Sequence, residues 1–260
     1  MNCEDKVVIV TGGAHGIGRA LASRFASEGA RAIVIADVDL NAAQTVADEV
    51  GGIMMKADVS DESDVIKLIE NVTERFGRID LLCSNAGIAG LAGGAEVAND
   101  VWQKIWEVNV MSHIYLARAV LPQMLERCSG YLLLTVSAAG LLTHFEAAPY
   151  TVSKHAALSF GEWLSIAHHD AGIRVSCLCP QGVNTRMILG EDGEQENFLR
   201  EGALEPEQVA ESVIEGLKDE RFLILPHPEV ADYFRHKATD YERWLRGLRR
   251  MRESVLATRV

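Results

Sequence analysis

The chain has 260 residues, of which 48% are hydrophobic and 24% are charged, a balance typical of a folded globular protein. This length can bury one large core, so the sequence predicts a single folded domain. The net charge of -12 argues against nonspecific binding of the whole protein to nucleic acid or to an anionic membrane, because both are themselves negative.

The first apolar run, VVIV, follows acidic residues and is far too short for a signal sequence or a membrane span. We therefore expect a cytoplasmic protein that does not sit in a membrane. The five cysteines lack C-x-x-C spacing, which indicates neither a disulfide framework nor a zinc site, so we expect no metal. Cys177 and Cys179 alternate along an apolar run and should lie buried on one face of a strand.

Seven apolar runs rich in β-branched residues recur along the chain, separated by stretches with helical periodicity. The runs span 6–11, 30–37, 51–58, 79–85, 130–137, 173–180 and 222–226. Continuous apolar strands that alternate with helices are typical of a parallel sheet covered on both faces. Side chains that can cap helices, Asp39, Ser60 or Asp61, and Asn99, precede three of the helical stretches. The predicted fold class is α/β with a doubly wound parallel sheet.

The turn TGGAHGIG lies between the first strand and the first helix, which is where ligands bind in such sheets. Gly12, Gly16 and Gly18 lack a Cβ, so the backbone can turn tightly and approach a pyrophosphate, which then meets the helix N-terminus. His15 and Ile17 lie between these glycines and belong to the same predicted cofactor loop. The position between strand and helix favours a dinucleotide-binding loop over an ordinary glycine-rich turn.

Asp37 ends the second strand, about twenty residues after the glycines. A carboxylate there can accept hydrogen bonds from the adenosine ribose hydroxyls, and it would repel the 2′-phosphate of NADP, with Asp39 adding to the repulsion. The sequence therefore favours NAD over NADP. His15 is the competing signal, because it could contact a phosphate. The alternative role for Asp37 is a cap on the next helix, and the two roles are compatible.

Tyr150 and Lys154 are four residues apart in APYTVSKHAAL and share one helix face. Taken alone, the pair could be two surface residues. Oxidising an alcohol with NAD requires a base, and a free tyrosine with a pKa near 10 is a poor base at neutral pH. We expect the positive charges of Lys154 and of the nicotinamide ring to lower the pKa of Tyr150.

The motifs TGGAHGIG, SNAG (84–87), VNV around Asn109, Ser137 at the end of the fifth strand and YTVSK occur in this order. Together they resemble the short-chain dehydrogenase/reductase family over about residues 6–225. The resemblance implies a Rossmann-like single domain and an NAD-dependent oxidoreductase acting on an alcohol or its ketone. Tyr150 would be the acid and base of that reaction.

The resemblance also implies roles for the remaining site residues. Ser137 would bind the substrate oxygen, Lys154 would hold the nicotinamide ribose, and Asn109 would hold a water that links Lys154 to solvent. The other cofactor-binding positions implied are Asp58 and Val59 at the adenine, Asn85 beneath the cofactor, and Pro180, Val183 and Thr185 beside the nicotinamide. The alternatives are a turn role for Ser137 and a helix distortion at Asn109.

Two departures from the family pattern stand out. Gln181 occupies the position where the family usually has a glycine after the proline, and glycine follows one position later, which puts the shape of the pocket roof in doubt. SNAG replaces the more usual NNAG, a change that we expect to be tolerated.

Three segments are expected to line the substrate pocket, namely AAGLLTHFEA, IAGLAGG and the stretch that begins RMILGEDG. Their apolar members are Leu141, Leu142, Phe145, Met187, Ile188 and Leu189. An apolar pocket cannot satisfy sugar hydroxyls, so these residues favour a hydrophobic secondary alcohol or ketone, whether alicyclic, aromatic or steroidal. The alternative is that these loop residues pack on the core. His144 could touch the substrate or be a bystander.

We divide the chain into a dehydrogenase domain, 1–228, and a C-terminal extension, 229–260. In the extension, aromatic and aliphatic residues recur at helical spacing with arginines between them, which predicts an amphipathic helix packed on this subunit or on a neighbour. Binding to a membrane surface or to an acidic partner is the alternative. The family resemblance implies a homodimer or homotetramer.

Two other functions compete with the dehydrogenase. A sugar-nucleotide epimerase or dehydratase would also use a tyrosine and a lysine, but this chain lacks the second domain and the glycine loop that such enzymes normally have. A sensor or scaffold that binds NAD without turnover would have no need of Tyr150, Lys154 and Ser137 together.

Overall fold

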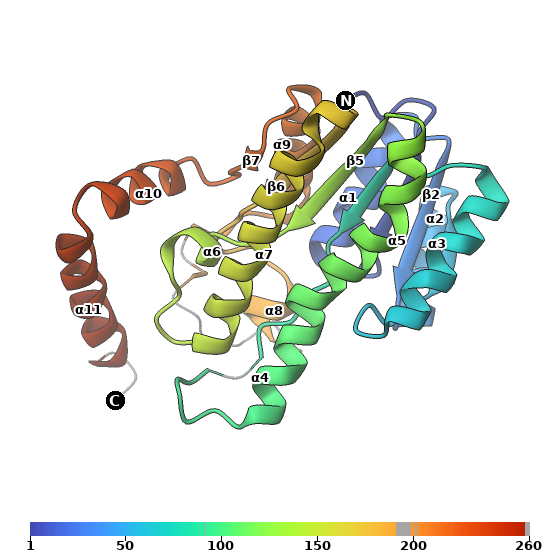
Figure 1. Ribbon diagram of the computed structural model, residues 1–260. Coiled ribbons are helices and arrows are strands. Elements are labelled where there is room, and N and C mark those ends of the chain that lie inside the picture. Colours follow the sequence, from blue (N-terminus) through green and yellow to red (C-terminus); the bar gives the residue numbers. More distant parts are fainter. Residues whose placement is uncertain (91, 191–198, 201, 258–260) are drawn as a thin grey trace.

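The computed structural model describes residues 1–90, 92–190, 199–200 and 202–257. Within them, seven strands form one parallel sheet in the order β3-β2-β1-β4-β5-β6-β7 (Figure 1). The strands are β1 (Val7–Thr11), β2 (Ala32–Asp37), β3 (Ile53–Lys56), β4 (Leu81–Ser84), β5 (Gly130–Thr135), β6 (Ile173–Leu178) and β7 (Leu223–Ile224). The predicted doubly wound α/β fold is confirmed, and each strand lies within the run that predicted it.

Helices connect the strands and cover both faces of the sheet. They are α1 (Gly16–Ser27), α2 (Leu40–Val50), α3 (Glu62–Phe76), α4 (Asn99–Trp106), α5 (Ser112–Glu126), α6 (Ala139–Leu142), α7 (Ala148–His168), α8 (Arg186–Leu189), α9 (Pro206–Lys218), α10 (Glu229–Thr239) and α11 (Tyr241–Ala257). A π-helical turn, η1 (Glu107–Met111), joins α4 to α5, and a short 3-10 turn, η2 (His169–Ala171), follows α7.

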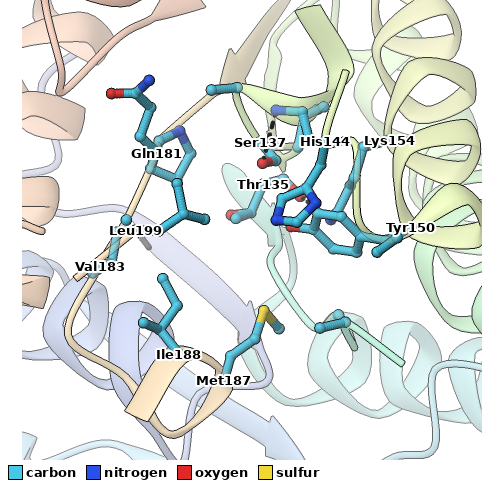
Figure 2. A pocket seen from close by; sticks show the side chains of 18 of the residues that line it. Thr135, Ser137, His144, Tyr150, Lys154, Gln181, Val183, Met187, Ile188 and Leu199 are labelled. Carbon is cyan, nitrogen blue, oxygen red and sulfur yellow. Dashed lines mark hydrogen bonds between the residues drawn. The ribbon is translucent and has the colours of Figure 1, made fainter. Parts of the chain in front are cut away.

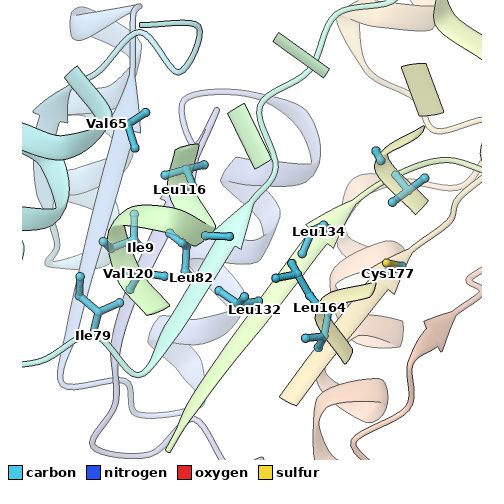
Figure 3. Close-up of a cluster of buried hydrophobic side chains, with 14 of the residues drawn as sticks. Ile9, Val65, Ile79, Leu82, Leu116, Val120, Leu132, Leu134, Leu164 and Cys177 are labelled. Atoms are coloured by element: carbon cyan, nitrogen blue, oxygen red, sulfur yellow. The ribbon is translucent and has the colours of Figure 1, made fainter. Parts of the chain in front are cut away.

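Two hydrophobic cores lie on opposite faces of the sheet because successive side chains of a strand point to opposite sides. Val7 and Ile9 of β1 pack under α3, α5 and α7, whereas Val8 and Val10 pack under α1, α2 and α9. Figure 3 shows the first of these cores, in which Leu82 and Leu132 of the central strands lie beneath Leu116. Cys177 and Cys179 both belong to this first core, as their alternation predicted.

The predicted helix starts are right for two helices and wrong in detail for a third. Asp39 caps α2 by accepting from the backbone N–H of Ala42, and Asp61 caps α3 by accepting from that of Ser63. Asn99 is not a cap, because it is the first residue of α4 and Ala98 holds the cap position in an extended conformation. The helix therefore begins at Asn99, one residue earlier than a cap at that position would place its start.

The strand order reverses its direction of growth between β1 and β4, which opens a crevice at the carboxyl ends of these strands. The C-terminal extension reaches toward the same side of the molecule (Figure 1). It forms two helices, α10 and α11, with a break at Asp240, where the sequence had predicted one amphipathic helix. α10 contacts α6, the short helix after β5, so the extension joins the body close to the site described next.

Candidate active site

The backbone of the glycine loop lies too close to neighbouring residues for side chains at three of its glycines. Gly12 has a φ of +62°, and a Cβ there would lie 2.8 Å from the Cα of Ala86. A Cβ on Gly18 would lie 2.1 Å from the carbonyl oxygen of Gly12, and one on Gly16, whose φ is +49°, would lie 2.9 Å from Thr185. The loop thus leaves a cradle of bare backbone at the start of α1, which suits a pyrophosphate.

Asp37 braces this loop from the end of β2. Its Oδ2 accepts from the backbone N–H of Ala14 at 3.0 Å, and its Oδ1 accepts from the backbone N–H of Asp39 at 3.0 Å. The alternative role of Asp37 as a helix cap is wrong, because Asp39 caps α2. Its place beside the ribose of a bound cofactor stays a prediction.

His15 lies against Asp39, with 2.9 Å between its Nε2 and a carboxylate oxygen. The backbone N–H of Ala42 and the His15 ring lower the pKa of Asp39, so this carboxylate is charged at neutral pH. Arg186 approaches the same imidazole at 3.4 Å. His15 is thus paired with a carboxylate in the structure, and one arginine lies beside the pair.

Two further predicted cofactor residues have clear structural contacts. The carboxylate of Asp58 accepts from the hydroxyl and the backbone N–H of Ser60, and these hydrogen bonds lower its pKa. Asn85 donates to the Thr11 carbonyl at 3.0 Å and accepts from the Thr135 hydroxyl at 3.0 Å. Asn85 therefore ties β1, β4 and β5 together at the base of the crevice.

Tyr150 and Lys154 project from α7 into this crevice (Figure 2). The ammonium of Lys154 donates to the Thr135 carbonyl at 3.0 Å and lies 5.7 Å from the centre of the Tyr150 ring. The Lys154 side chain is 3% exposed, so its charge has little contact with water. The structure brings together the two residues that the helical spacing predicted would share a face.

Burial dominates the protonation of this pair. It lowers the pKa of Lys154 to about 8 and raises the pKa of Tyr150, with the Ser137 hydroxyl acting in the opposite direction on Tyr150. The expectation that Lys154 lowers the pKa of Tyr150 is therefore not met by the chain's own groups. Desolvation opposes the charged form of each residue and is the largest cause of both pKa shifts.

Ser137 and Asn109 both have the structural roles that were considered as alternatives. The Ser137 Oγ accepts from the backbone N–H of Ala139 at 3.0 Å, as a turn residue does, while facing Tyr150 (Figure 2). Asn109 sits in the π-helical turn η1, and its side chain bonds both backbone groups of Ile88 and the hydroxyl of Ser153. Its amide group thus fixes the loop after β4 beside α7.

His113 was missed by sequence reasoning. It is fully enclosed, with its Nδ1 2.6 Å from the Ser84 Oγ, and its Nε2 has no hydrogen-bond partner among the described residues. Burial and the nearby charge of Lys154 lower the pKa of His113 to about 3, so the ring is neutral. The sequence did carry a signal for this contact. Ser84 is the residue at which SNAG departs from the more usual NNAG, and it is the residue that His113 contacts.

The segment PQGVNT forms the wall opposite Tyr150. Pro180, Val183 and Thr185 all line the crevice, and the backbone N–H of Gln181 donates to His227 at 3.2 Å. A Cβ on Gly182 would lie 2.1 Å from the Leu199 carbonyl oxygen. The glycine is therefore needed one position later than usual, because the backbone of Leu199 packs against that position.

Most of the predicted site residues border one cleft of about 1710 Å³, whereas Asn109 and His113 are not among its lining residues. This is more than the 300–1,000 Å³ that a single small-molecule site usually occupies, so the cleft has room for a cofactor and a second molecule. In Figure 2, His144 lies beside Tyr150 on one wall, and Met187 and Ile188 lie on the opposite wall. The remaining predicted cofactor residues in the lining are Gly12, His15, Gly16, Ile17, Gly18, Asp37, Asp58, Val59 and Asn85.

The predicted pocket lining is partly right. Leu142 and Phe145 border the cleft with Met187 and Ile188, whereas Leu141 is 2% exposed and belongs to the core beneath it. Leu189 is not among the lining residues, and positions 91 and 191–193 of the predicted segments lie outside the described residues. The largest omission is the C-terminal extension, which borders the outer part of the cleft through both α10 and α11.

Comparison with known proteins agrees with this arrangement. The chain matches the family model described as short chain dehydrogenase over residues 6–196. The chain belongs to the short-chain dehydrogenase family. A solved short chain dehydrogenase/reductase from Burkholderia phymatum in complex with NAD superposes with a TM-score of 0.84 at 31% identity, covering 93% of this chain and 96% of that one.

Two curated members of the family are similar along most of their length. The chain is 33% identical over 248 residues to 1-deoxy-11-beta-hydroxypentalenate dehydrogenase of Streptomyces exfoliatus, covering 92% of this chain and 90% of that protein. It is 33% identical over 218 residues to meso-2,3-butanediol dehydrogenase of Serratia marcescens, covering 81% and 86%. The chain is thus similar to dehydrogenases of small-molecule alcohols.

The described residues hold neither a membrane-spanning helix nor a cluster of metal ligands. Across those residues, no helix is both long and apolar enough to cross a membrane. The same part of the chain holds no group of three or more histidine, cysteine, aspartate or glutamate side chains that could bind a metal ion.

Proposed function

We propose that this short-chain dehydrogenase uses NAD to interconvert a hydrophobic secondary alcohol and its ketone, with Tyr150 as acid and base. The observation that carries the proposal is the placement of Tyr150, Ser137 and Lys154 in one cleft with the bare glycine loop. Bound NAD would accept the hydride from the alcohol carbon. The glycine loop and Asp37 would hold its adenosine half, and Lys154 would hold the nicotinamide ribose.

In the reaction, Ser137 donates a hydrogen bond to the substrate oxygen while Tyr150 exchanges a proton with that oxygen. The buried phenol, whose pKa is raised, is protonated at neutral pH, and this is the form that reduces a ketone by proton donation. Oxidation requires the phenolate. We therefore expect the rate of oxidation to rise with pH from neutral into the alkaline range, and the rate of reduction to stay constant until the pH approaches the raised pKa of Tyr150.

We infer a preference for NAD over NADP from the charges at the end of β2. Asp37 and the charged Asp39 would both repel a 2′-phosphate. Arg186 opposes them, since its guanidinium lies 3.4 Å from the His15 ring that pairs with Asp39. The ratio of kcat/KM for the two cofactors measures the outcome, and a value favouring NADP would contradict the inference.

The cleft supports a bulky hydrophobic substrate. Leu142, Phe145, Met187 and Ile188 give it apolar walls close to Tyr150, and such walls cannot satisfy the hydroxyls of a sugar. Of the two relatives, 1-deoxy-11-beta-hydroxypentalenate dehydrogenase is named for a more complex substrate than meso-2,3-butanediol dehydrogenase. We propose a ring-containing alcohol, alicyclic or steroidal, over a short-chain diol.

The first experiment follows nicotinamide absorbance with NAD, and separately with NADP, over a panel of alicyclic, aromatic and steroidal alcohols. Tyr150→Phe is expected to abolish turnover while cofactor binding remains. Tyr115→Phe is the matched control, since it also removes a tyrosine hydroxyl, and Tyr115 is a half-buried residue of α5 that does not border the cleft. Binding of NAD without turnover of any alcohol or ketone would contradict the proposed activity.

We also propose that the protein is a homodimer or homotetramer. Trp163 and Ile166 lie on the outward face of α7, with exposed fractions of 58% and 83%. Large apolar side chains this exposed favour contact with a second copy of the chain. Light scattering of the purified protein tests the proposal, and a monomer at micromolar concentration would contradict it.

A further inference from the structure

The cleft continues beyond Tyr150 to the C-terminal extension, which is anchored to the body of the protein. Val230 of α10 is fully buried, and Lys237, 8% exposed, donates from its ammonium to the Leu141 carbonyl of α6. Trp244, near the start of α11, packs against the hydrophobic core that contains Val230, and its ring is tilted against that of Tyr233. These contacts hold the first turns of α11 in place along the outer edge of the cleft.

The face of α11 that borders the cleft combines apolar and cationic side chains. Trp244, Leu248 and Met251 lie three to four residues apart and form an apolar stripe along it. Arg243 and Arg250 border the cleft as well. Seven residues are almost two full turns, so the two arginines project from the same side of the helix, about 10 Å apart along its axis.

These two guanidiniums have no ion pair with any described residue. Asp240 is the acid nearest in sequence that also borders the cleft, and its Oδ1 accepts from the backbone N–H of Arg243. Glu229 also borders the cleft, but it is the first residue of α10 and lies about 15 Å along that helix from its C-terminal end, where α11 follows. Glu146 is a further lining carboxylate, in the loop between α6 and α7. Among the described lining residues of α11 and its junction with α10, two arginines stand against one carboxylate, so the α11 side of the cleft is positive.

We propose that Arg243 and Arg250 bind a carboxylate at the far end of the substrate. The substrate would be an amphipathic molecule whose ring system covers the apolar stripe, with its hydroxyl at Tyr150 and its acid group at α11. Arginine suits this task because its planar guanidinium donates two parallel hydrogen bonds to a carboxylate. The proposal rests on the proposed dehydrogenase activity and adds the substrate class.

The test compares a hydroxysteroid that carries a carboxylic acid side chain with its uncharged methyl ester. Both are assayed with wild-type protein, with Arg243→Gln/Arg250→Gln, and with the control Arg246→Gln/Arg252→Gln. The control removes two charges from the same helix at positions that do not border the cleft. Net charge is therefore equal in the two double variants.

For Arg243→Gln/Arg250→Gln, we expect KM for the acid to rise about tenfold to hundredfold with kcat nearly unchanged, since charged hydrogen bonds to the substrate are lost. KM for the ester should change less than twofold, and the control should leave both substrates unaffected. Added salt should raise KM for the acid in the wild type and have little effect in the double variant. Equal changes for acid and ester would overturn the proposal, because they would mean that the arginines only shape the cleft.

A second measurement separates this proposal from the activity itself. If the wild type turns over neither these two compounds nor any alcohol or ketone of the panel, the proposed dehydrogenase function fails. Calorimetric binding of the same steroid acid to the protein with NAD present then tests the anion site alone. Binding that is lost in Arg243→Gln/Arg250→Gln and kept in the control supports the site, and binding that is equal in all three proteins overturns it.

Discussion

Replacing Lys154 with methionine should stabilise the folded protein while abolishing its activity. The ammonium is almost wholly enclosed, and burial lowers its pKa from 10.5 to about 8. At pH 7 the lysine is protonated in both the folded and the unfolded chain, so the folded protein bears the full cost of the buried charge. A shift of about 2.5 pKa units corresponds to a cost of about 3 kcal/mol.

Methionine fills a similar volume and removes that charge, but it also removes the hydrogen bond to the Thr135 carbonyl. Losing this bond costs about 1–3 kcal/mol, so the net gain in the free energy of unfolding at pH 7 is about 1 kcal/mol. The change with pH is the sharper quantity, because the lost hydrogen bond does not titrate.

The sign of the pH effect follows from the two pKa values of Lys154. Above pH 8 the folded protein releases the proton first, so the cost of the buried charge falls, and it vanishes above pH 10.5, where both states are neutral. Between pH 7 and pH 9.5, the advantage of Lys154→Met over the wild type should shrink by about 2 kcal/mol.

Urea unfolding of both proteins without cofactor, at pH 7 and at pH 9.5, measures this difference, with equal m-values as the check on two-state behaviour. Lys67→Met is the control, because Lys67 is 66% exposed and its loss should change stability by less than about 0.5 kcal/mol at either pH. A constant difference between Lys154→Met and the wild type across this pH range would refute the reasoning, since it would show that burial does not perturb the lysine.

Further predictions concern the loop, the cofactor preference, a buried ring and the core. Gly18→Ala places a Cβ 2.1 Å from a carbonyl oxygen and should weaken NAD binding at least tenfold by fluorescence titration; unchanged affinity would mean that the loop yields easily. Asp37→Ser should raise kcat/KM for NADP about tenfold or more relative to NAD. The His113 ring, with its pKa near 3, should show no titration between pH 5 and 9 in its ¹⁵N NMR shifts. Leu82→Ala, at 1% exposure, should cost about 2–5 kcal/mol in urea unfolding, and a loss under 1 kcal/mol would contradict the assigned core.

Sequence and structure agree best where a signal is local. The strands could be located from local sequence alone. An apolar, β-branched stretch flanked by glycines and polar residues indicates a strand that is buried on both faces, whichever strands lie beside it. Asp39 and Asp61 could be identified as caps for the same reason, because a cap bonds to its own helix. Asn99 shows the limit, because the position of a cap depends on a single backbone conformation.

At Ser137 and Asn109 the functional and structural interpretations describe the same side chain. Ser137 holds the turn after β5 and faces Tyr150, and Asn109 fixes the loop after β4 through Ile88 within a π-helical turn. The structural role is therefore observed at both positions, and the catalytic role of each stays a prediction. Each side chain must be held by such contacts before it can present a fixed atom to a substrate.

The sequence by itself determined the order of strands along the chain, the bare glycine loop and the shared face of Tyr150 and Lys154, because backbone periodicity and helical spacing act over a few residues. The tertiary structure decided what meets across long separations. It placed His113 against Ser84, turned Leu141 into the core, and brought Arg243 of the extension to the edge of the cleft. These contacts depend on how helices pack on the sheet, and burial in that packed interior raises the pKa of Tyr150 in the protein without cofactor.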